Sequence, residues 1–202
     1  MFRFFFRLYN KLYSLILMPS QHFIGRLYLK AAGVRFGSNP RLYGLPMISV
    51  YRNSQINLGN DVTLRSTSRG NAIGVNHEVI LRTQNEAAII RIGNRVGMSG
   101  GSICALHSVT IGDDVLIGSN VVIADNDFHQ IAFKDRKLNA NLVADPVFIE
   151  NGVWIGADSY ICKGVTIGCN SVIGAKSVVT KSIPPNSMAA GIPAKLIKSL
   201  SS

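Results

Sequence analysis

The chain has 202 residues, of which 47% are hydrophobic, and its 21 basic and 11 acidic side chains give a formal net charge of +10. This length suits one domain with a small appendage, and the apolar content allows a sizeable core. The three cysteines lack C-x-x-C spacing, which argues against a disulfide framework or a zinc site, and no nucleic-acid-binding motif accompanies the positive charge.

The N-terminal 52 residues contain eight basic side chains and no acidic one. Residues 1–18 read MFRFFFRLYNKLYSLILM, in which the polar residues form a narrow stripe at helical spacing and apolar residues fill the rest of the wheel. We therefore predict a basic, apolar N-terminal helical segment within residues 1–52. Residues 1–30 either contact a membrane surface peripherally or pack on the protein or a neighbouring subunit. The apolar run is too short to span a bilayer, and no signal-peptide cleavage site follows it.

A six-residue repeat dominates the chain from residue 53 to the C-terminus. Weak copies near residues 56 and 90 precede clear ones, which run IGDDVL, IGSNVV and IADNDF from residue 111 and IENGVW to VTKSIP from residue 149. A period of six describes a short extended segment followed by a corner, so three units close a triangular coil of about 18 residues. Stacked coils bury the Ile or Val that begins each unit. The sequence therefore predicts an all-β fold, a parallel β-helix over residues 53–202.

The repeat stops over residues 124–146, which begin with ADNDFHQIAFKDRK. Long irregular excursions from a compact domain are more often functional than decorative, which makes His129 a candidate catalytic residue. Asp125 and Asp127 are candidates to orient its imidazole, and the sequence does not choose between them. Arg136 either binds an acceptor molecule through its guanidinium fork or pairs with a neighbouring aspartate.

The hexads resemble the hexapeptide-repeat, or isoleucine-patch, acyltransferase superfamily. The likeness is strongest over residues 109–123 and 153–198, and the second segment is similar to maltose, galactoside and polysaccharide O-acetyltransferases. It implies a left-handed parallel β-helix, a homotrimer with active sites shared between subunits, and acetyl-CoA as acyl donor. The D-N-D-F-H of residues 125–129 matches the D-x-D-F-H pattern of related enzymes, so the resemblance implies that His129 is the general base.

The resemblance also implies the binding residues. Coenzyme A would lie in a groove between neighbouring β-helices, with contacts from Trp154, Gly156, Ala157, Gly174, Ala175, Lys181, Lys195 and Lys198. The segment around residues 98–108 would line the acceptor pocket through Ser99, Ser102 and His107. The Gly100–Gly101 pair is typical of a tight corner, and AKLIKSL, after the prolines 184 and 185, is expected to form a short C-terminal helix.

These features favour an acetyl-CoA-dependent O-acetyltransferase acting on a sugar hydroxyl of a cell-surface polysaccharide or its lipid-linked precursor. We expect a cytoplasmic protein, peripheral on the inner face of the cytoplasmic membrane if the N-terminal segment binds lipid. The alternatives are an N-acyltransferase on a nucleotide-linked amino sugar and an inactive β-helical scaffold. A zinc enzyme needs three converging histidines. His77, His107 and His129 are out of phase with an 18-residue coil, so we expect no metal site.

Overall fold

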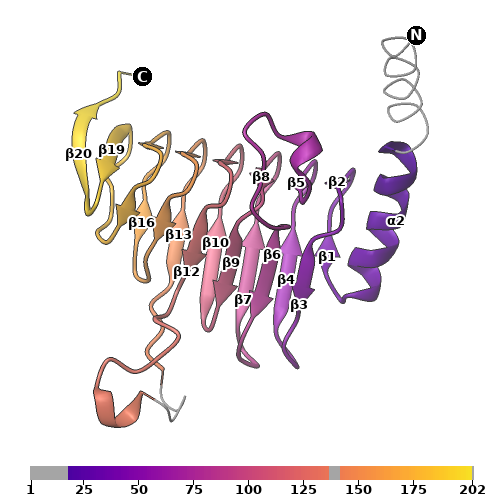
Figure 1. The fold of residues 1–202 in the computed structure, drawn as a ribbon, viewed down its shortest axis with the longest axis horizontal. Helices are drawn as coiled ribbons and strands as arrows, with labels where there is room; N and C mark the ends of the chain where they lie inside the picture. Colours follow the sequence, from indigo (N-terminus) through magenta and orange to yellow (C-terminus); the bar gives the residue numbers. More distant parts are fainter. Residues whose placement is uncertain (1–17, 137–141, 202) are drawn as a thin grey trace.

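The computed structural model describes residues 18–136 and 142–201, and within them a single α-helix stands at one end of a column of short strands (Figure 1). The column is a parallel β-helix, as the repeat predicts, and it is left-handed, as the family resemblance implies. The part of the predicted N-terminal helix that precedes Met18 lies outside the described residues.

The strands form three sheets, which we call faces A, B and C, and the chain visits them in that order in each coil. Face A holds β1 (Arg35–Phe36), β4 (Gln55–Leu58), β7 (Ile89–Ile92), β10 (Ser108–Ile111), β13 (Val147–Ile149) and β16 (Thr166–Ile167). Face B holds β2 (Arg41–Tyr43), β5 (Thr63–Arg65), β8 (Gly97–Ser99), β11 (Leu116–Ile117), β14 (Trp154–Ile155), β17 (Val172–Ile173), β19 (Ser187–Gly191) and β20 (Ala194–Ser199). Face C holds β3 (Met47–Ser49), β6 (Ile80–Thr83), β9 (Ser102–Ala105), β12 (Val122–Ala124), β15 (Tyr160–Ile161) and β18 (Val178–Val179).

The repeat builds the core because one aliphatic residue of each unit occupies the same register in every coil. On face B this inward ladder runs through Leu42, Leu64, Met98, Ile117, Ile155, Ile173 and Ala189, all buried. Faces A and C add equivalent ladders, which reach Val179 on face C and continue past Ile167 to the buried Ile183 on face A. Stacking thus buries a continuous aliphatic column that no single coil could bury by itself.

Small and polar residues turn the corners, as the repeat predicts. Asp114, Asn120 and Asp158 adopt a left-handed backbone conformation with φ of 59° to 61°, which Asn and Asp tolerate better than most residues. Gly100 and Gly101 form the predicted tight corner, with φ of 56° and 75°.

The helix α2 (Met18–Ala31) covers the first coil. It ends in a Schellman motif, in which the N–H of Gly33 donates to Lys30 at 3.1 Å and the N–H of Val34 donates to Leu29 at 3.0 Å. A Cβ at Gly25 would lie 2.3 Å from the Leu42 side chain, so glycine there allows α2 to lie directly on the column. The coil stack starts at β1, so residues 35–52, which the sequence analysis places in the N-terminal segment, belong to the β-helix.

The predicted C-terminal helix is wrong. The residues AKLIKS form β20, which pairs antiparallel with β19 at the far end of the column from α2 (Figure 1). Nearly all side chains of β20 are exposed. Its sequence therefore lacks the alternation of apolar and polar residues that marks a half-buried strand. The pairing covers the edge of β19, and β20 is the terminal strand of face B at this end.

Candidate functional site

The break in the repeat is an excursion, residues 125–146, that leaves the column between β12 on face C and β13 on face A (Figure 1). Its two ends meet at the column, where Asn126 and Ala144 form an antiparallel bridge and the Asp145 N–H donates to the Asp125 carbonyl at 2.8 Å. This paired neck fixes the base of the excursion to the corner between faces C and A, which we call the CA edge.

Asp125 is fully buried, and its carboxylate holds that neck in place. It accepts hydrogen bonds from the backbone N–H of Leu106 at 2.8 Å and of His107 at 2.7 Å, both in the preceding coil, and from the Asn126 amide at 2.9 Å. These donors account for both carboxylate oxygens. The described contacts of Asp125 therefore serve the corner that carries His107, and none of them is with the imidazole of His129.

His129 lies on the exposed part of the excursion, next to Asp127. Its backbone N–H donates to the Asp127 carbonyl at 2.7 Å, and the Asp127 carboxylate forms an ion pair with Lys163 of the next coil. The two side chains and Lys163 line a small pocket of about 100 Å³ together with Gln130, Ile131, Ala132, Leu142 and Val143. Of the two candidate aspartates, Asp127 shares a pocket with His129.

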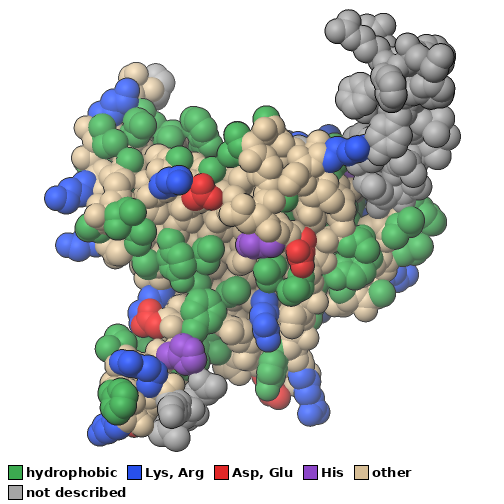
Figure 2. Space-filling view, viewed as in Figure 1, with side chains coloured by type: hydrophobic (Ala, Val, Ile, Leu, Met, Phe, Trp, Pro, Cys, Tyr) green, Lys and Arg blue, Asp and Glu red, His purple; other side chains and the backbone are tan. Residues whose placement is uncertain are grey.

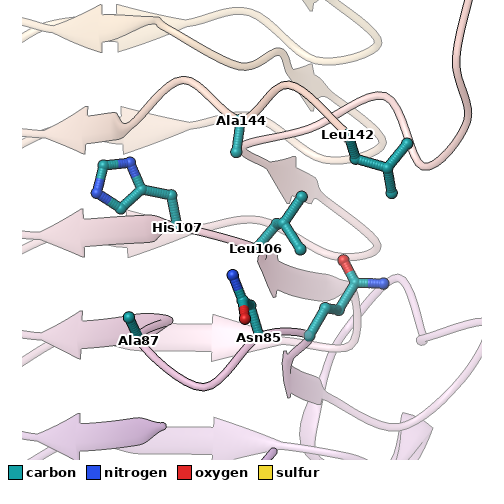
Figure 3. Close-up of a pocket in the computed structure, with 7 residues that line it drawn as sticks. Asn85, Ala87, Leu106, His107, Leu142 and Ala144 are labelled. Atoms are coloured by element: carbon teal, nitrogen blue, oxygen red, sulfur yellow. The ribbon is translucent and has the colours of Figure 1, made fainter. Parts of the chain in front are cut away.

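A larger pocket, of about 490 Å³, opens beside the neck on the same CA edge (Figure 3). It is lined by Asn85 and Ala87 from one coil, Leu106 and His107 from the next, and Leu142 and Ala144 from the excursion, with Gln84 completing the wall. Amides and an imidazole thus surround an aliphatic floor, an arrangement able to bind a ligand with both hydroxyl groups and apolar carbons. We call it the CA pocket.

The other predicted acceptor residues do not meet in the CA pocket. Ser99 and Ser102 flank the Gly100–Gly101 corner between faces B and C, one corner away from His107. Arg136 remains within the excursion, where it donates to the Ile131 carbonyl at 2.9 Å and stacks on the Phe133 ring at 5.9 Å. Gln84 and Asn85 were not predicted from the sequence, because polar residues occur at many corners of the repeat and nothing in the sequence marks these two.

A third pocket, of about 380 Å³ and mainly apolar, runs along face B and the corner between faces B and C. It brings together the five small and aromatic residues predicted for donor binding: Trp154, Gly156, Ala157, Gly174 and Ala175. It also contains residues that the sequence analysis missed, namely Asn71, Ile73, Gly118, Ser119, Val172, Ile173 and Met188. We call this pocket the BC groove.

The glycines of the BC groove are required by coil stacking. A Cβ at Gly156 would lie 2.4 Å from the backbone N of Ala175 in the next coil, and a Cβ at Gly174 would lie 2.7 Å from the Ala190 side chain. Ala157 and Ala175, by contrast, are open to the groove and bear small side chains. Substitutions at the alanines therefore test groove function, whereas substitutions at the glycines test the fold.

The predicted cationic residues separate into two places. Lys195 and Lys198 lie on β20, beside Ala190 and Met188 of β19, and Met188 lines the BC groove. Figure 2 shows Lys and Arg side chains gathered around this end of the column. Lys181 follows β18, at the CA edge, so one chain does not bring it to its own BC groove.

Two of the described thiols, those of Cys104 and Cys162, are poor nucleophiles. Burial raises the pKa of Cys104 above its usual value, and burial together with the nearby Asp127 charge raises the pKa of Cys162. Both side chains are therefore protonated near neutral pH. No group of three or more metal-ligating side chains gathers within residues 18–136 and 142–201.

In one chain the two halves of the candidate site face different directions. His129 and the CA pocket belong to the CA edge, whereas the BC groove belongs to another corner of the triangular column, and the lining of the BC groove shares no residue with either pocket on the CA edge. Within one chain, His129 therefore does not line the BC groove.

Comparison with known proteins gives two matches to family models. Residues 146–181 match the bacterial transferase hexapeptide (six repeats), and residues 108–124 match the hexapeptide repeat of succinyl-transferase. The galactoside O-acetyltransferase of Escherichia coli K12 is 49% identical over 94 residues, which are 46% of this chain and 45% of that protein. The putative lipopolysaccharide biosynthesis O-acetyl transferase WbbJ of the same organism is 40% identical over 103 residues, which are 48% of this chain and 53% of that protein.

Among solved structures, a galactoside acetyltransferase in complex with coenzyme A is similar over 91% of this chain and 82% of its own, with 26% sequence identity and a TM-score of 0.50. The curated relatives named above match over about half of their length. The comparisons show that the chain has hexapeptide repeats and the fold of a hexapeptide-repeat acetyltransferase.

Proposed function

Because the chain carries the hexapeptide repeats of bacterial transferases on the left-handed β-helix of hexapeptide-repeat acetyltransferases, we propose that it is an acetyl-CoA-dependent O-acetyltransferase. Its acceptor is a sugar hydroxyl of a cell-surface polysaccharide or of its lipid-linked precursor. The names of the two relatives described above, a galactoside and a lipopolysaccharide O-acetyltransferase, support this acceptor class.

The observation that carries the proposal is the BC groove. It is narrow and mainly apolar, is walled by Trp154, and has Ala157 and Ala175 as small, open corner residues. An extended pantetheine arm can lie along such corners and bond their backbone groups. Lys195 and Lys198 stand at the end of the groove near Met188, where they can pair with the phosphates of the donor.

His129 supplies the chemistry in this proposal. Its neutral imidazole takes the proton of the acceptor hydroxyl while the hydroxyl oxygen attacks the thioester carbonyl carbon. The tetrahedral intermediate then collapses, the carbon–sulfur bond breaks, and the imidazolium returns the proton to the leaving thiolate. The products are an acetyl ester and coenzyme A. Asp127 lines the same pocket as His129 and is the proposed residue that orients its imidazole, while Lys163 fixes the Asp127 carboxylate.

The CA pocket is the proposed acceptor site. Its neutral amides and His107 can exchange hydrogen bonds with sugar hydroxyls, and Leu106, Leu142 and Ala144 can pack on the apolar face of a sugar ring. In this scheme Asp125 is a positioning residue, because its carboxylate holds the corner that carries His107. Arg136, Ser99 and Ser102, predicted at the acceptor site, remain candidates for contact with a longer acceptor or a neighbouring chain.

We also propose a homotrimer in which the CA edge of one chain faces the BC groove of the next. This arrangement supplies His129 and Lys181 from one chain and the groove from another, which resolves their separation within one chain. In a closed ring of three identical contacts, each groove receives the excursion of one neighbouring chain.

The exposed face of α2 supports a proposal of peripheral membrane contact. Phe23, Ile24 and Leu27 are 65%, 52% and 55% exposed, and Arg26 and Lys30 are exposed among them. Figure 2 shows hydrophobic side chains at this end of the molecule. Apolar side chains interleaved with cations suit the surface of an anionic bilayer. No helix within the described residues is long and apolar enough to cross a membrane.

The proposed reaction is tested with His129→Ala and acetyl-CoA. The variant should fold normally and lose about 100-fold to 10,000-fold of its transfer rate, the usual contribution of general base catalysis. Lys134→Ala, an exposed change in the same excursion, is the matched control and should keep wild-type turnover. An alkali-labile product identifies an ester, whereas a stable product would indicate the N-acyltransferase alternative. Wild-type turnover in His129→Ala would refute the assignment.

The membrane proposal is tested by flotation with vesicles of phosphatidylcholine with and without phosphatidylglycerol. The full chain should float with the anionic vesicles, and Leu27→Glu should reduce the floated fraction. Ile197→Glu, which alters a similarly exposed side chain at the other end of the column, is the control and should float as wild type does. If equal fractions of Leu27→Glu and Ile197→Glu float with the anionic vesicles, the proposed membrane contact through α2 is contradicted.

A further inference from the structure

A 14-residue insertion reaches one end of the BC groove. In the coil that contains Gly100 and Gly101, face B passes to face C through those two residues alone, whereas one coil earlier the same corner is replaced by residues 66–79. The insertion contains the 3-10 helix η2 (Ser68–Gly70), and it places Asn71 and Ile73 in the lining of the groove. Figure 1 shows it standing out from the column between β5 and β6.

The insertion is tied to the corners that form the groove. Its Asn76 N–H donates to the Asn120 side chain at 2.8 Å, and the Asn120 amide in turn donates to Asp158 at 3.1 Å. A Cβ at Gly100 would lie 3.0 Å from Val75, so the bare glycine corner leaves room for the insertion to lie across it. The Ile73 N–H donates to the Asn71 side chain at 2.9 Å. The tip that carries Ile73 is therefore held beside the groove.

Ser119 is the polar residue at this end that has no partner. It is 2% exposed, it lines the BC groove, and its Oγ has no hydrogen-bond partner among the residues that the structure describes. Strand register places Ser119 where the next two coils have Ala157 and Ala175. The turn thus forms with alanine at this position, and stacking does not call for the hydroxyl. A buried hydroxyl left unpaired costs free energy, which a ligand in the groove can recover.

The charges define a direction along the groove. Lys176, Lys195 and Lys198 lie at the C-terminal end of the column, and no acidic residue follows Asp158 in the sequence. From Met188 to Ser119 the groove crosses three strand spacings, or about 14 Å. A donor whose phosphates pair with the lysines would therefore extend its acyl end toward Ser119 and Ile73.

We propose that Ser119 and the insertion residues Asn71 and Ile73 form an acyl-end subsite of the donor groove. Ser119 Oγ donates a hydrogen bond to a carbonyl oxygen of the bound acyl-pantetheine arm, and Ile73 closes the groove against acyl groups longer than acetyl. The inference rests on the proposed function, because it takes an acyl-CoA thioester as the ligand of the groove. It adds a donor-binding hydroxyl and a length limit that the hexad repeat does not encode.

Calorimetric titration of the full chain with acetyl-CoA tests the subsite without relying on turnover. Ser119→Ala should bind acetyl-CoA about fivefold more weakly than wild type, the loss expected for one hydrogen bond. Its unliganded melting temperature should equal or exceed that of wild type, because the change removes an unpaired buried hydroxyl. Ser177→Ala is the matched control: its hydroxyl is buried at the same corner but donates to the Gly174 carbonyl at 2.6 Å. That change should lower the melting temperature and leave affinity unchanged.

The length limit is tested by comparing acetyl-CoA with butyryl-CoA. Wild type should prefer acetyl-CoA, and Ile73→Ala should reduce that preference about tenfold, the discrimination typical of a methylene-sized block. Ile24→Ala, on α2 at the far end of the column, should keep the wild-type preference.

The outcomes separate the donor proposal from the role of the Ser119 hydroxyl and from the role of Ile73 as a wall. A wild-type chain that binds no acyl-CoA would overturn the donor proposal itself. Binding by wild type with unchanged affinity in Ser119→Ala would overturn the role of the hydroxyl, and unchanged length preference in Ile73→Ala would overturn the wall.

Discussion

Replacing Asp125 by alanine should damage the fold far more than the same change at Asp127, although the two residues are almost adjacent in sequence. The Asp125 carboxylate is fully buried and accepts three hydrogen bonds of 2.7 to 2.9 Å, two of them from backbone N–H groups of the preceding coil. Asp127 is half-exposed and pairs with a single lysine. The Asp125 carboxylate joins the excursion to the preceding coil inside the protein, whereas the Asp127 carboxylate joins the excursion to Lys163 at the surface.

The magnitudes follow from burial. Each hydrogen bond to a charged acceptor contributes about 1.5–3 kcal/mol, but removal of the carboxylate also removes its own desolvation cost. Leu106 is half-buried and His107 is exposed, so water can reach the N–H groups that are freed. We therefore expect Asp125→Ala to lower the free energy of unfolding by about 2–4 kcal/mol. Asp127→Ala should lower it by about 0–1 kcal/mol, as for other exposed ion pairs.

Urea unfolding at one fixed protein concentration measures both variants, because the stability of the proposed homotrimer would depend on protein concentration. Asp125→Asn retains one acceptor oxygen and should fall between wild type and Asp125→Ala. If the two alanine variants unfold at the same urea concentration, the assignment of Asp125 as the residue that holds the neck is wrong.

Two further predictions concern the cationic end of the groove and the thiols. The double variant Lys195→Ala/Lys198→Ala should raise the KM for acetyl-CoA about tenfold with little change in kcat, because it removes uniform binding of the donor, and added salt should narrow the difference. An unchanged KM would place the phosphates elsewhere. Alkylation of Cys104 and Cys162 by iodoacetamide should be slower at pH 8 than that of free cysteine and should accelerate as the pH rises, since the pKa of each thiol is raised and the thiolate forms only at higher pH. Reaction at the rate of the free amino acid would show that these side chains are not shielded.

The column was predictable from the sequence because its rule is local. The Ile or Val that begins each hexad, such as Ile149 or Ile155, is buried in the core. The constant length of the repeat aligns it with the equivalent residue of the next coil. The same locality explains the prediction of the excursion that carries His129, since it is defined by its departure from the repeat, whereas the groove alanines were predicted from the family resemblance.

Features that depend on the next coil were not predictable. Asp125 and Asp127 look alike in sequence, and only the stacking of the excursion neck on Leu106 and His107 distinguishes them. The strand β20 has no periodicity of its own and exists because β19 offers an edge. Ile73 belongs to an insertion with no repeat, and its place in the groove follows from a bond to a corner two coils away.

The central claim is that acetyl transfer takes place where the His129 edge of one chain meets the BC groove of another, and a complementation measurement tests it most directly. Two inactive chains, His129→Ala and Ala175→Leu, are produced separately and together in equal amounts, and acetyl transfer to a glycan acceptor is measured. Ala175 is open to the groove, so leucine there fills the groove without displacing the next coil. Ala31→Leu on α2 is the control for the added side chain and should keep full activity.

If each site takes its histidine from one chain and its groove from the neighbour, random mixing leaves about one quarter of the sites with both halves intact. We therefore expect the mixture to recover about a quarter of wild-type activity, while each variant by itself remains inactive. Activity in the mixture no higher than that of either variant alone would contradict a site shared between chains.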